Sequence, residues 1–159
     1  MFSISELLVG AGYLGICPLP GRFSSYNADL ATILEWRPNL VISATTWVEF
    51  ERDGVSQFPK DLENRKIDWV HFPVADYATP QGEVQSWTEI SDQAHGILDG
   101  GGRVLTHCYG GCGRSGMVFV RLMCEAGKPV ERAIKRLREV RPCAVETAAQ
   151  IEWAAETLL

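Results

Sequence analysis

The sequence has 159 residues, of which 46% are hydrophobic, which is enough apolar material for one domain with a sizeable core. The net charge is -5 and Lys and Arg form no long basic surface, which argues against nucleic acid as a partner. No run approaches the ~18 apolar residues of a membrane span and no basic leader opens the chain, so we expect one compact domain over residues 1–159, with no membrane partner, in the cytoplasm.

The first half of the chain alternates strand-like and helix-like runs. Two short β-rich runs, residues 4–9 and 13–17, flank a glycine turn and predict the opening strands. Residues 25–36 carry Leu and Ile at helical spacing, which predicts the first helix. Two further β-rich runs bounded by turn residues, 39–43 and 67–72, predict buried strands.

The second half predicts one more strand and four helices. Residues 84–98 place apolar side chains on one face and predict a crossover helix that leads to a strand at 103–107. Three closing helices are expected at residues 115–126, 130–141 and 147–158. The alternation predicts an α/β fold in which a central, mostly parallel sheet is flanked by helices, the last three of them C-terminal.

A glycine-rich loop lies between the strand at 103–107 and the helix that follows it. From His107 it reads HCYGGCGRSG. The backbone N–H groups of such a curled loop point inward and the helix N-terminus adds a partial positive charge, so the loop favours a phosphate-like oxyanion. The expected phosphate-binding positions are Tyr109, Gly110, Gly111, Cys112, Gly113 and Arg114. No lysine follows the glycines, which disfavours a nucleotide-binding loop.

The same loop carries the residues of a covalent mechanism. Cys108 lies among N–H dipoles and near Arg114, which favours the thiolate, a nucleophile for phosphorus. The planar guanidinium of Arg114 can bind two phosphate oxygens at once. Ser115 can donate its hydroxyl to the Cys108 sulfur when that sulfur leaves, and we expect His107 to hold the loop by hydrogen bonding.

Cleavage of a phosphate ester also needs a proton for the departing oxygen, which predicts an acidic residue beside the loop. Asp76 follows the strand at 67–72, and a parallel sheet places such a loop on the same edge as the glycine-rich loop. Asp68 falls inside a strand, Asp92 inside a helix, and Asp99 before the cysteine strand, at the opposite edge. The alternative for Asp76 is a solvated turn residue.

The five cysteines are an odd number and include no C-x-x-C pair, so we expect reduced thiols and no metal site. Cys112 is not needed for phosphate chemistry. It either fills a tolerant loop position or forms a reversible disulfide with Cys108 that protects the thiolate from over-oxidation.

With these residues in place, the sequence resembles the cysteine-dependent protein phosphatases of the compact dual-specificity class, and within it the kinase-associated phosphatases that act on cyclin-dependent kinases. The loop matches that group's HCYGGxGRS pattern, FPVADYATP resembles its general-acid loop, and YLGICPLPGRF and RPCAVETAAQ resemble its opening and closing segments. The resemblance spans most of the chain. It implies a phosphotyrosine-phosphatase-like fold, a phosphorylated protein as substrate, and no metal or organic cofactor.

The resemblance also implies residue roles. Cys108 is then the nucleophile, Arg114 the phosphate-binding residue, Asp76 the general acid and then base, and Ser115 the hydroxyl that assists turnover. Further positions that match the family are Thr45 and Glu49, which brace the cysteine loop there, and Gln150, which either positions water or lies on a helix surface.

The resemblance implies a shallow site, because the chain is too short for the extra elements with which tyrosine-only phosphatases of this superfamily deepen their pocket. Such a site accepts phosphotyrosine and also leaves phosphoserine and phosphothreonine open. The loop carries no extra Lys or Arg between Cys108 and Arg114, which disfavours highly phosphorylated lipids. Two other functions stay open: a phosphate-reading pseudophosphatase, and a thiol-dependent oxyanion reductase of the arsenate type, with Cys112 or Cys124 relaying a disulfide.

Overall fold

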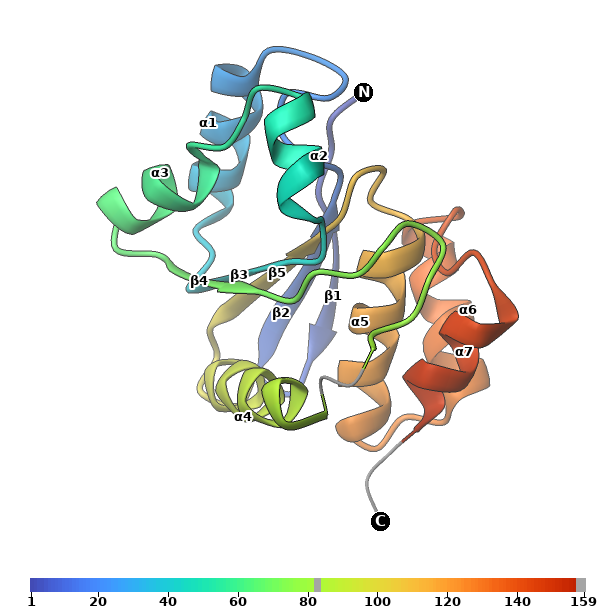
Figure 1. Cartoon of the computed structure of the whole chain (residues 1–159). Helices are drawn as coiled ribbons and strands as arrows, with labels where there is room; N and C mark the ends of the chain where they lie inside the picture. The colour runs from blue at the N-terminus through green and yellow to red at the C-terminus, as the bar shows by residue number, and fades with distance from the viewer. Residues whose placement is uncertain (82–83, 157–159) are drawn as a thin grey trace.

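The structure is a computed structural model that describes residues 1–81 and 84–156. Its centre is a sheet with the strand order β1-β2-β5-β3-β4 (Figure 1). The strands are β1 (Ser5–Val9), β2 (Gly12–Cys17), β3 (Leu40–Ser43), β4 (Asp68–His71) and β5 (Arg103–His107). β1 pairs with β2 in the antiparallel sense and all other neighbours are parallel, which confirms the mostly parallel sheet.

Helices cover both faces of this sheet (Figure 1). One face carries α1 (Tyr26–Trp36), α2 (Trp47–Arg52) and α3 (Phe58–Asn64). The other carries α4 (Val84–Asp99) and α5 (Gly113–Glu125), with α6 (Val130–Val140) and α7 (Ala148–Ala155) packed against α5. The three expected closing helices are therefore present. The last residues of the final one, 157–158, lie outside the described part of the chain.

The helices α2 and α3 were not predicted from the sequence. They are only 6 and 7 residues long, too short to show a helical repeat of apolar residues. What holds them is tertiary packing: Phe50 of α2 and Phe58 and Leu62 of α3 are fully buried. A capping box formed by Thr46 and Glu49 opens α2.

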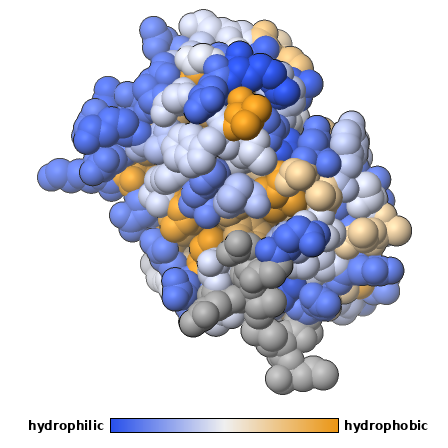
Figure 2. Space-filling view, in the orientation of Figure 1, coloured by the Kyte–Doolittle hydropathy of each residue, from blue (hydrophilic) through white to orange (hydrophobic). Residues whose placement is uncertain are grey.

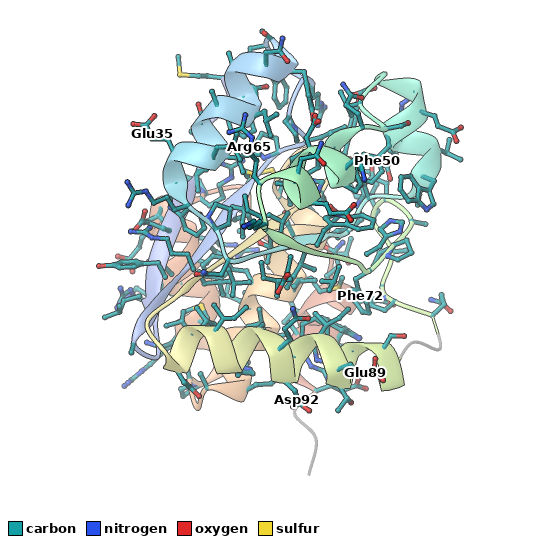
Figure 3. The ribbon with its side chains drawn as sticks, turned by 90° about the vertical axis from the view of Figure 1, so that its left-hand side faces the viewer. Glu35, Phe50, Arg65, Phe72, Glu89 and Asp92 are labelled. Carbon is teal, nitrogen blue, oxygen red and sulfur yellow. A yellow bond between two sulfur atoms is a disulfide. The ribbon has the colours of Figure 1, made fainter. Side chains whose placement is uncertain are left out.

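The hydrophobic core is divided by the sheet into two clusters. Phe50 belongs to the cluster under α1 to α3, and Phe72, directly after β4, belongs to the cluster under α4 and α5. In Figure 3 both rings point into the molecule, whereas Glu35 on α1 and Glu89 and Asp92 on α4 point away from the sheet. This separation of inward apolar side chains from outward charged ones is what the helical spacing of apolar residues requires.

Most of the face shown in Figure 2 is covered by hydrophilic side chains, with hydrophobic ones exposed in limited areas. Among the described residues, no helix combines the length and the apolar character needed to cross a lipid bilayer.

The parallel strands bring four chain segments to one edge of the sheet. Ser43 at the end of β3 is the register partner of both His71 and His107, the last residues of β4 and β5. Cys17 at the end of β2 pairs with His107 as well. The segments that follow these strands therefore leave the sheet side by side, which is where functional loops of parallel sheets meet.

Candidate active site

The glycine-rich segment forms a tight loop between β5 and α5, which we call the cysteine loop (residues 108–113). Gly111 has φ +71°, and a Cβ placed there would approach the backbone of Cys17 and Pro18 to 2.7 Å. The same segment after β2 also holds the loop through Leu19, whose N–H donates to the Tyr109 carbonyl oxygen at 3.1 Å. Glycine is thus required at Gly111, both for its conformation and for the close approach of the chain after β2.

His107 fastens the start of the cysteine loop to the sheet. Its Nδ1 lies 3.2 Å from the Cys108 carbonyl oxygen, and its Nε2 is hydrogen-bonded to the Ser43 hydroxyl. Burial lowers the pKa of His107 to about 4, so the ring is neutral near pH 7. It holds the loop by hydrogen bonds, as predicted, and carries no charge beside Cys108.

Cys108 and Ser115 come together at the bottom of the loop. The Cys108 thiol is only 2% exposed and Ser115, in the first turn of α5, is fully buried. The Sγ of Cys108 and the Oγ of Ser115 are 3.0 Å apart, within hydrogen-bonding distance for sulfur. The hydroxyl expected near the sulfur is therefore in contact with it.

Arg114 is the largest fully buried side chain in the described chain and is held by Glu49. Its Nη1 and Nη2 donate to the two Glu49 carboxylate oxygens at 2.7 and 2.8 Å, and Nη1 also donates to the Val74 carbonyl oxygen at 2.9 Å. Burial alone raises the pKa of Glu49, but the hydrogen bonds from Arg114 and Thr46 outweigh it and lower the pKa. The pair is therefore charged, and Glu49 fixes the plane of the guanidinium.

The expectation that Thr45 braces the loop as Glu49 does finds no contact to support it. The Thr45 hydroxyl is buried without a hydrogen-bond partner among the described residues, and only its carbonyl oxygen is used, accepting from His71 at 2.6 Å. Glu49 alone of these two contacts Arg114.

Asp76 lies on the loop that follows β4, which we call the acid loop (residues 72–80). Its Oδ1 accepts a hydrogen bond from the Tyr77 N–H at 3.0 Å and lies 3.5 Å from the Arg114 Nη2. The side chain is 52% exposed, so it faces solvent and the pocket rather than the core. The competing carboxylates are elsewhere: Asp68 starts β4 at the far edge, and Asp92 lies on the outer face of α4 (Figure 3).

Of these residues, Cys108 and Asp76 line one pocket of about 360 Å³. It is bounded by the cysteine loop, by Asp76 and Tyr77 of the acid loop, by Arg22 and Phe23, and by Glu146. The last four of these side chains, Arg22, Phe23, Tyr77 and Glu146, were not predicted from the sequence. They lie in the segments that carry the family resemblance, but no sequence pattern assigned them to the pocket, and the topology brings them to the loop.

Glu146 brings a second carboxylate to the pocket. It hydrogen-bonds the Gly113 backbone, and a Cβ on Gly113 would collide with its carboxylate. Burial, and after it the charge of Asp76, raises the pKa of Glu146. Two acidic side chains therefore occupy the side of the pocket near the start of α5.

Gln150 is buried, so its alternative role as a helix-surface residue is wrong. Its Oε1 accepts from the N–H groups of Glu146 and Thr147 at 2.8 and 3.2 Å, and its Nε2 donates to the Ala78 carbonyl oxygen at 3.3 Å. It caps α7 and ties the segment before that helix to the acid loop.

The expectation of reduced thiols is also wrong for two cysteines, because Cys112 forms a disulfide with Cys143. The proposed Cys108–Cys112 disulfide is absent and Cys108 is free. The reason is the docking of the segment before α7 on the cysteine loop. Arg141 donates from Nε to the Gly111 carbonyl oxygen at 2.9 Å, and the Val145 N–H donates to the Cys112 carbonyl oxygen at 3.0 Å. Cys143 lies between these two bonds.

Two further thiols are free: Cys17 lies in the strand beside His107, and Cys124 lies away from this chemistry. Cys124 is buried in the core on α5, in the position of a small hydrophobic residue. Among the described residues, no group of three or more His, Cys, Asp or Glu side chains is arranged to hold a metal ion.

Comparisons with known proteins agree on one family. The family described as cyclin-dependent kinase inhibitor 3 (CDKN3) matches residues 3–131. The cyclin-dependent kinase inhibitor 3 of Homo sapiens is 35% identical over 153 residues, covering 91% of this chain and 71% of its own length. The protein of the same name from Rattus norvegicus is 28% identical over 152 residues, with the same coverage.

Solved structures give the same result for the fold. A kinase associated phosphatase (KAP) with its catalytic-site cysteine replaced by serine superposes with a TM-score of 0.86 at 26% identity, covering 98% of this chain and 93% of its own. Tk-PTP in its active form superposes with a TM-score of 0.76 at 26% identity, covering 99% of this chain and 100% of its own.

Proposed function

Since the chain belongs to the cyclin-dependent kinase inhibitor 3 (CDKN3) family and is a protein phosphatase, we propose that it hydrolyses phosphotyrosine monoesters through a cysteinyl-phosphate intermediate. The observation that carries this proposal is the convergence of Cys108, Asp76 and the cysteine loop on one pocket, with Ser115 in contact with the sulfur. Residues 1–159 would then form one catalytic domain.

In the first step the phosphoryl group sits in the cysteine loop, held by backbone N–H groups and by the Arg114 guanidinium. The Cys108 sulfur attacks phosphorus, so an S–P bond forms while the P–O bond to the tyrosine oxygen breaks. Asp76 gives its proton to that oxygen, and tyrosine leaves. Glu49 keeps Arg114 in a fixed plane, so that little reorganisation is needed when the charge moves.

In the second step a water molecule attacks phosphorus on the cysteinyl phosphate. Asp76, now a carboxylate, accepts a proton from this water, and the S–P bond breaks to release inorganic phosphate. Ser115 donates its hydroxyl hydrogen to the departing Cys108 sulfur, which stabilises the thiolate.

The substrate we propose is a phosphorylated protein. The exposed rings of Phe23 and Tyr77 at the pocket suit an aryl phosphate, and phosphoserine and phosphothreonine are second choices for the same site. The described loop positions between Cys108 and Arg114 carry no Lys or Arg, so highly phosphorylated lipids are poorer substrates. Phosphate-like oxyanions such as vanadate should bind in the loop.

We place the protein in the cytoplasm, where a Cys112–Cys143 disulfide would be unusual. Alkylation of thiols during lysis, followed by cell fractionation and mass spectrometry, reads out the location and the state of this pair together.

The direct test is hydrolysis of an aryl phosphate and of a phosphotyrosine peptide near pH 6. We expect turnover of both and inhibition by vanadate. Cys108→Ser should abolish turnover and keep phosphate binding, whereas Cys124→Ser, a change at a free thiol in the core, should keep both. No turnover together with no vanadate binding would refute the proposal.

Two rival functions have distinct readouts. A phosphate-reading pseudophosphatase would bind phosphopeptides without turnover. An oxyanion reductase would reduce arsenate with consumption of thiols, and Asp76→Ala would leave that rate unchanged. The buried position of Cys124 counts against its part in a disulfide relay.

A further inference from the structure

Arg22 lines the catalytic pocket, yet the hydrolysis described above does not use it. Its guanidinium carbon lies 3.9 Å from the centre of the Tyr109 ring and 4.5 Å from that of Phe23. Its Nη1 is 2.9 Å from the position a Cβ on Gly110 would occupy. The cation therefore rests directly on the backbone of the phosphate-binding loop.

The position of Arg22 is set by the chain that carries it. Its N–H donates to the Leu19 carbonyl oxygen at 3.2 Å and closes a turn, and Leu19 in turn is bonded to Tyr109. The guanidinium is stacked on an aromatic ring, a contact that orders the side chain. Arg22 is thus held at the mouth of the pocket rather than swinging freely in solvent.

The charge of Arg22 has no carboxylate partner within the part of the chain that the structure describes. Asp29, the acidic residue nearest to Arg22 in the sequence, and Asp53, which accepts from the Tyr109 hydroxyl, are engaged elsewhere. Asp29 accepts from the Gly21 N–H and the Ser24 hydroxyl at 2.8 and 2.6 Å, and Asp53 pairs with Arg52. Stacking occupies the face of a guanidinium and leaves the N–H groups in its plane free to donate.

The charges around the pocket are therefore unequal. Arg22 lies against Gly110, whereas Glu146 lies against Gly113 at the start of α5. An acidic side chain next to the phosphorylated residue is attracted on the Arg22 side and repelled on the Glu146 side. Because Arg22 lies against Gly110, such a side chain belongs to a residue within about two positions of the phosphorylated one, at ~3.5 Å per residue.

We propose that Arg22 is a substrate-recognition residue that binds the carboxylate of an acidic residue flanking the phosphotyrosine. The inference rests on the proposed function, since it concerns which phosphopeptides that same pocket prefers. The expected substrates are phosphotyrosine segments with an acidic residue close to the phosphotyrosine, on either its N-terminal or its C-terminal side but not equally on both.

The test measures kcat/KM for five phosphotyrosine peptides. The parent peptide has Gln at the two positions before and the two positions after the phosphotyrosine, and each of the other four has Glu at one of these four positions. At least one Glu peptide should be hydrolysed roughly two- to fivefold better than the Gln parent, the size expected for an exposed ion pair. The gain should shrink as salt is raised. In Arg22→Gln the Glu and Gln peptides should become equal.

Arg52→Gln is the matched control. Arg52 stacks on the same Tyr109 ring at 4.7 Å, but it pairs with Asp53 and does not line the pocket. This variant should keep the full preference for Glu. An unchanged preference in Arg22→Gln, or no preference in the wild type, would overturn the inference while turnover of the Gln parent upholds the proposed function. No turnover of any peptide would overturn both.

Discussion

Breaking the bond between Cys112 and Cys143 should destabilise the protein without changing its fold. The disulfide links residues 31 positions apart and so restricts the unfolded chain, and Cys143→Ser removes that restriction. The loop-closure entropy for this length corresponds to a loss of about 3.7 kcal/mol in the free energy of unfolding at 25 °C. The hydrogen bonds from Arg141 and Val145 to the cysteine loop do not involve the sulfur atoms, so the folded contact persists.

Urea unfolding with and without dithiothreitol measures this effect. Wild-type protein should lose about 3.7 kcal/mol when the reductant is added, and Cys143→Ser should show the same lowered stability in both buffers. Two results would refute the reasoning. One is a wild type that does not respond to dithiothreitol, and the other is a Cys143→Ser variant that still does, because the second means that Cys112 has another partner such as Cys108.

Three further predictions follow from the site. Asp76→Ala should slow the hydrolysis of phosphotyrosine peptides by about 10²–10⁴-fold, and should slow the hydrolysis of aryl phosphates with good leaving groups far less. Equal losses in the two assays would show that Asp76 is not the general acid. Glu49→Ala leaves the Arg114 guanidinium, which is 1% exposed, without its carboxylate partner. Urea titrations should show a free energy of unfolding that is lower by about 3–5 kcal/mol. A loss under about 1 kcal/mol would mean that the pair is not buried as described. Burial lowers the pKa of His107 to about 4 from an ordinary ~6.5. As the pH falls, the histidine therefore binds a proton in the unfolded chain at a higher pH than in the folded protein. The stability that the neutral ring supports is therefore complete above ~6.5 and is lost as the pH falls toward 4, by up to about 1.4 kcal/mol per pH unit. Urea unfolding at a series of pH values should show a shallower pH dependence in His107→Asn than in the wild type, and parallel curves would contradict the neutral buried ring.

The local parts of the site were predictable because one stretch of sequence contains them. The strand, the glycine-rich turn and the helix that holds Arg114 and Ser115 are consecutive, and their order alone predicts an anion-binding loop. The position of Asp76 beside the cysteine loop could be predicted from topology, since the loops after parallel strands meet at one edge of the sheet.

The contacts that the sequence did not predict join segments far apart in the chain. Cys143 is 31 residues from Cys112 and no spacing rule relates them. Arg22 reaches the cysteine loop only because β2 pairs with β5, and Gln150 is buried only because α7 packs on α5 beside the acid loop. Short helices such as α2 are likewise held by burial of Phe50 rather than by their own sequence.

The central claim is that Cys108 forms a covalent bond to the phosphoryl group. Acid quenching of the protein within the first turnover of a phosphotyrosine peptide, followed by mass spectrometry of its proteolytic fragments, tests it directly. We predict one phosphoryl group on Cys108 in the wild type and none in Cys108→Ser. A phosphoryl group on any other residue, or steady turnover by Cys108→Ser, would contradict the account.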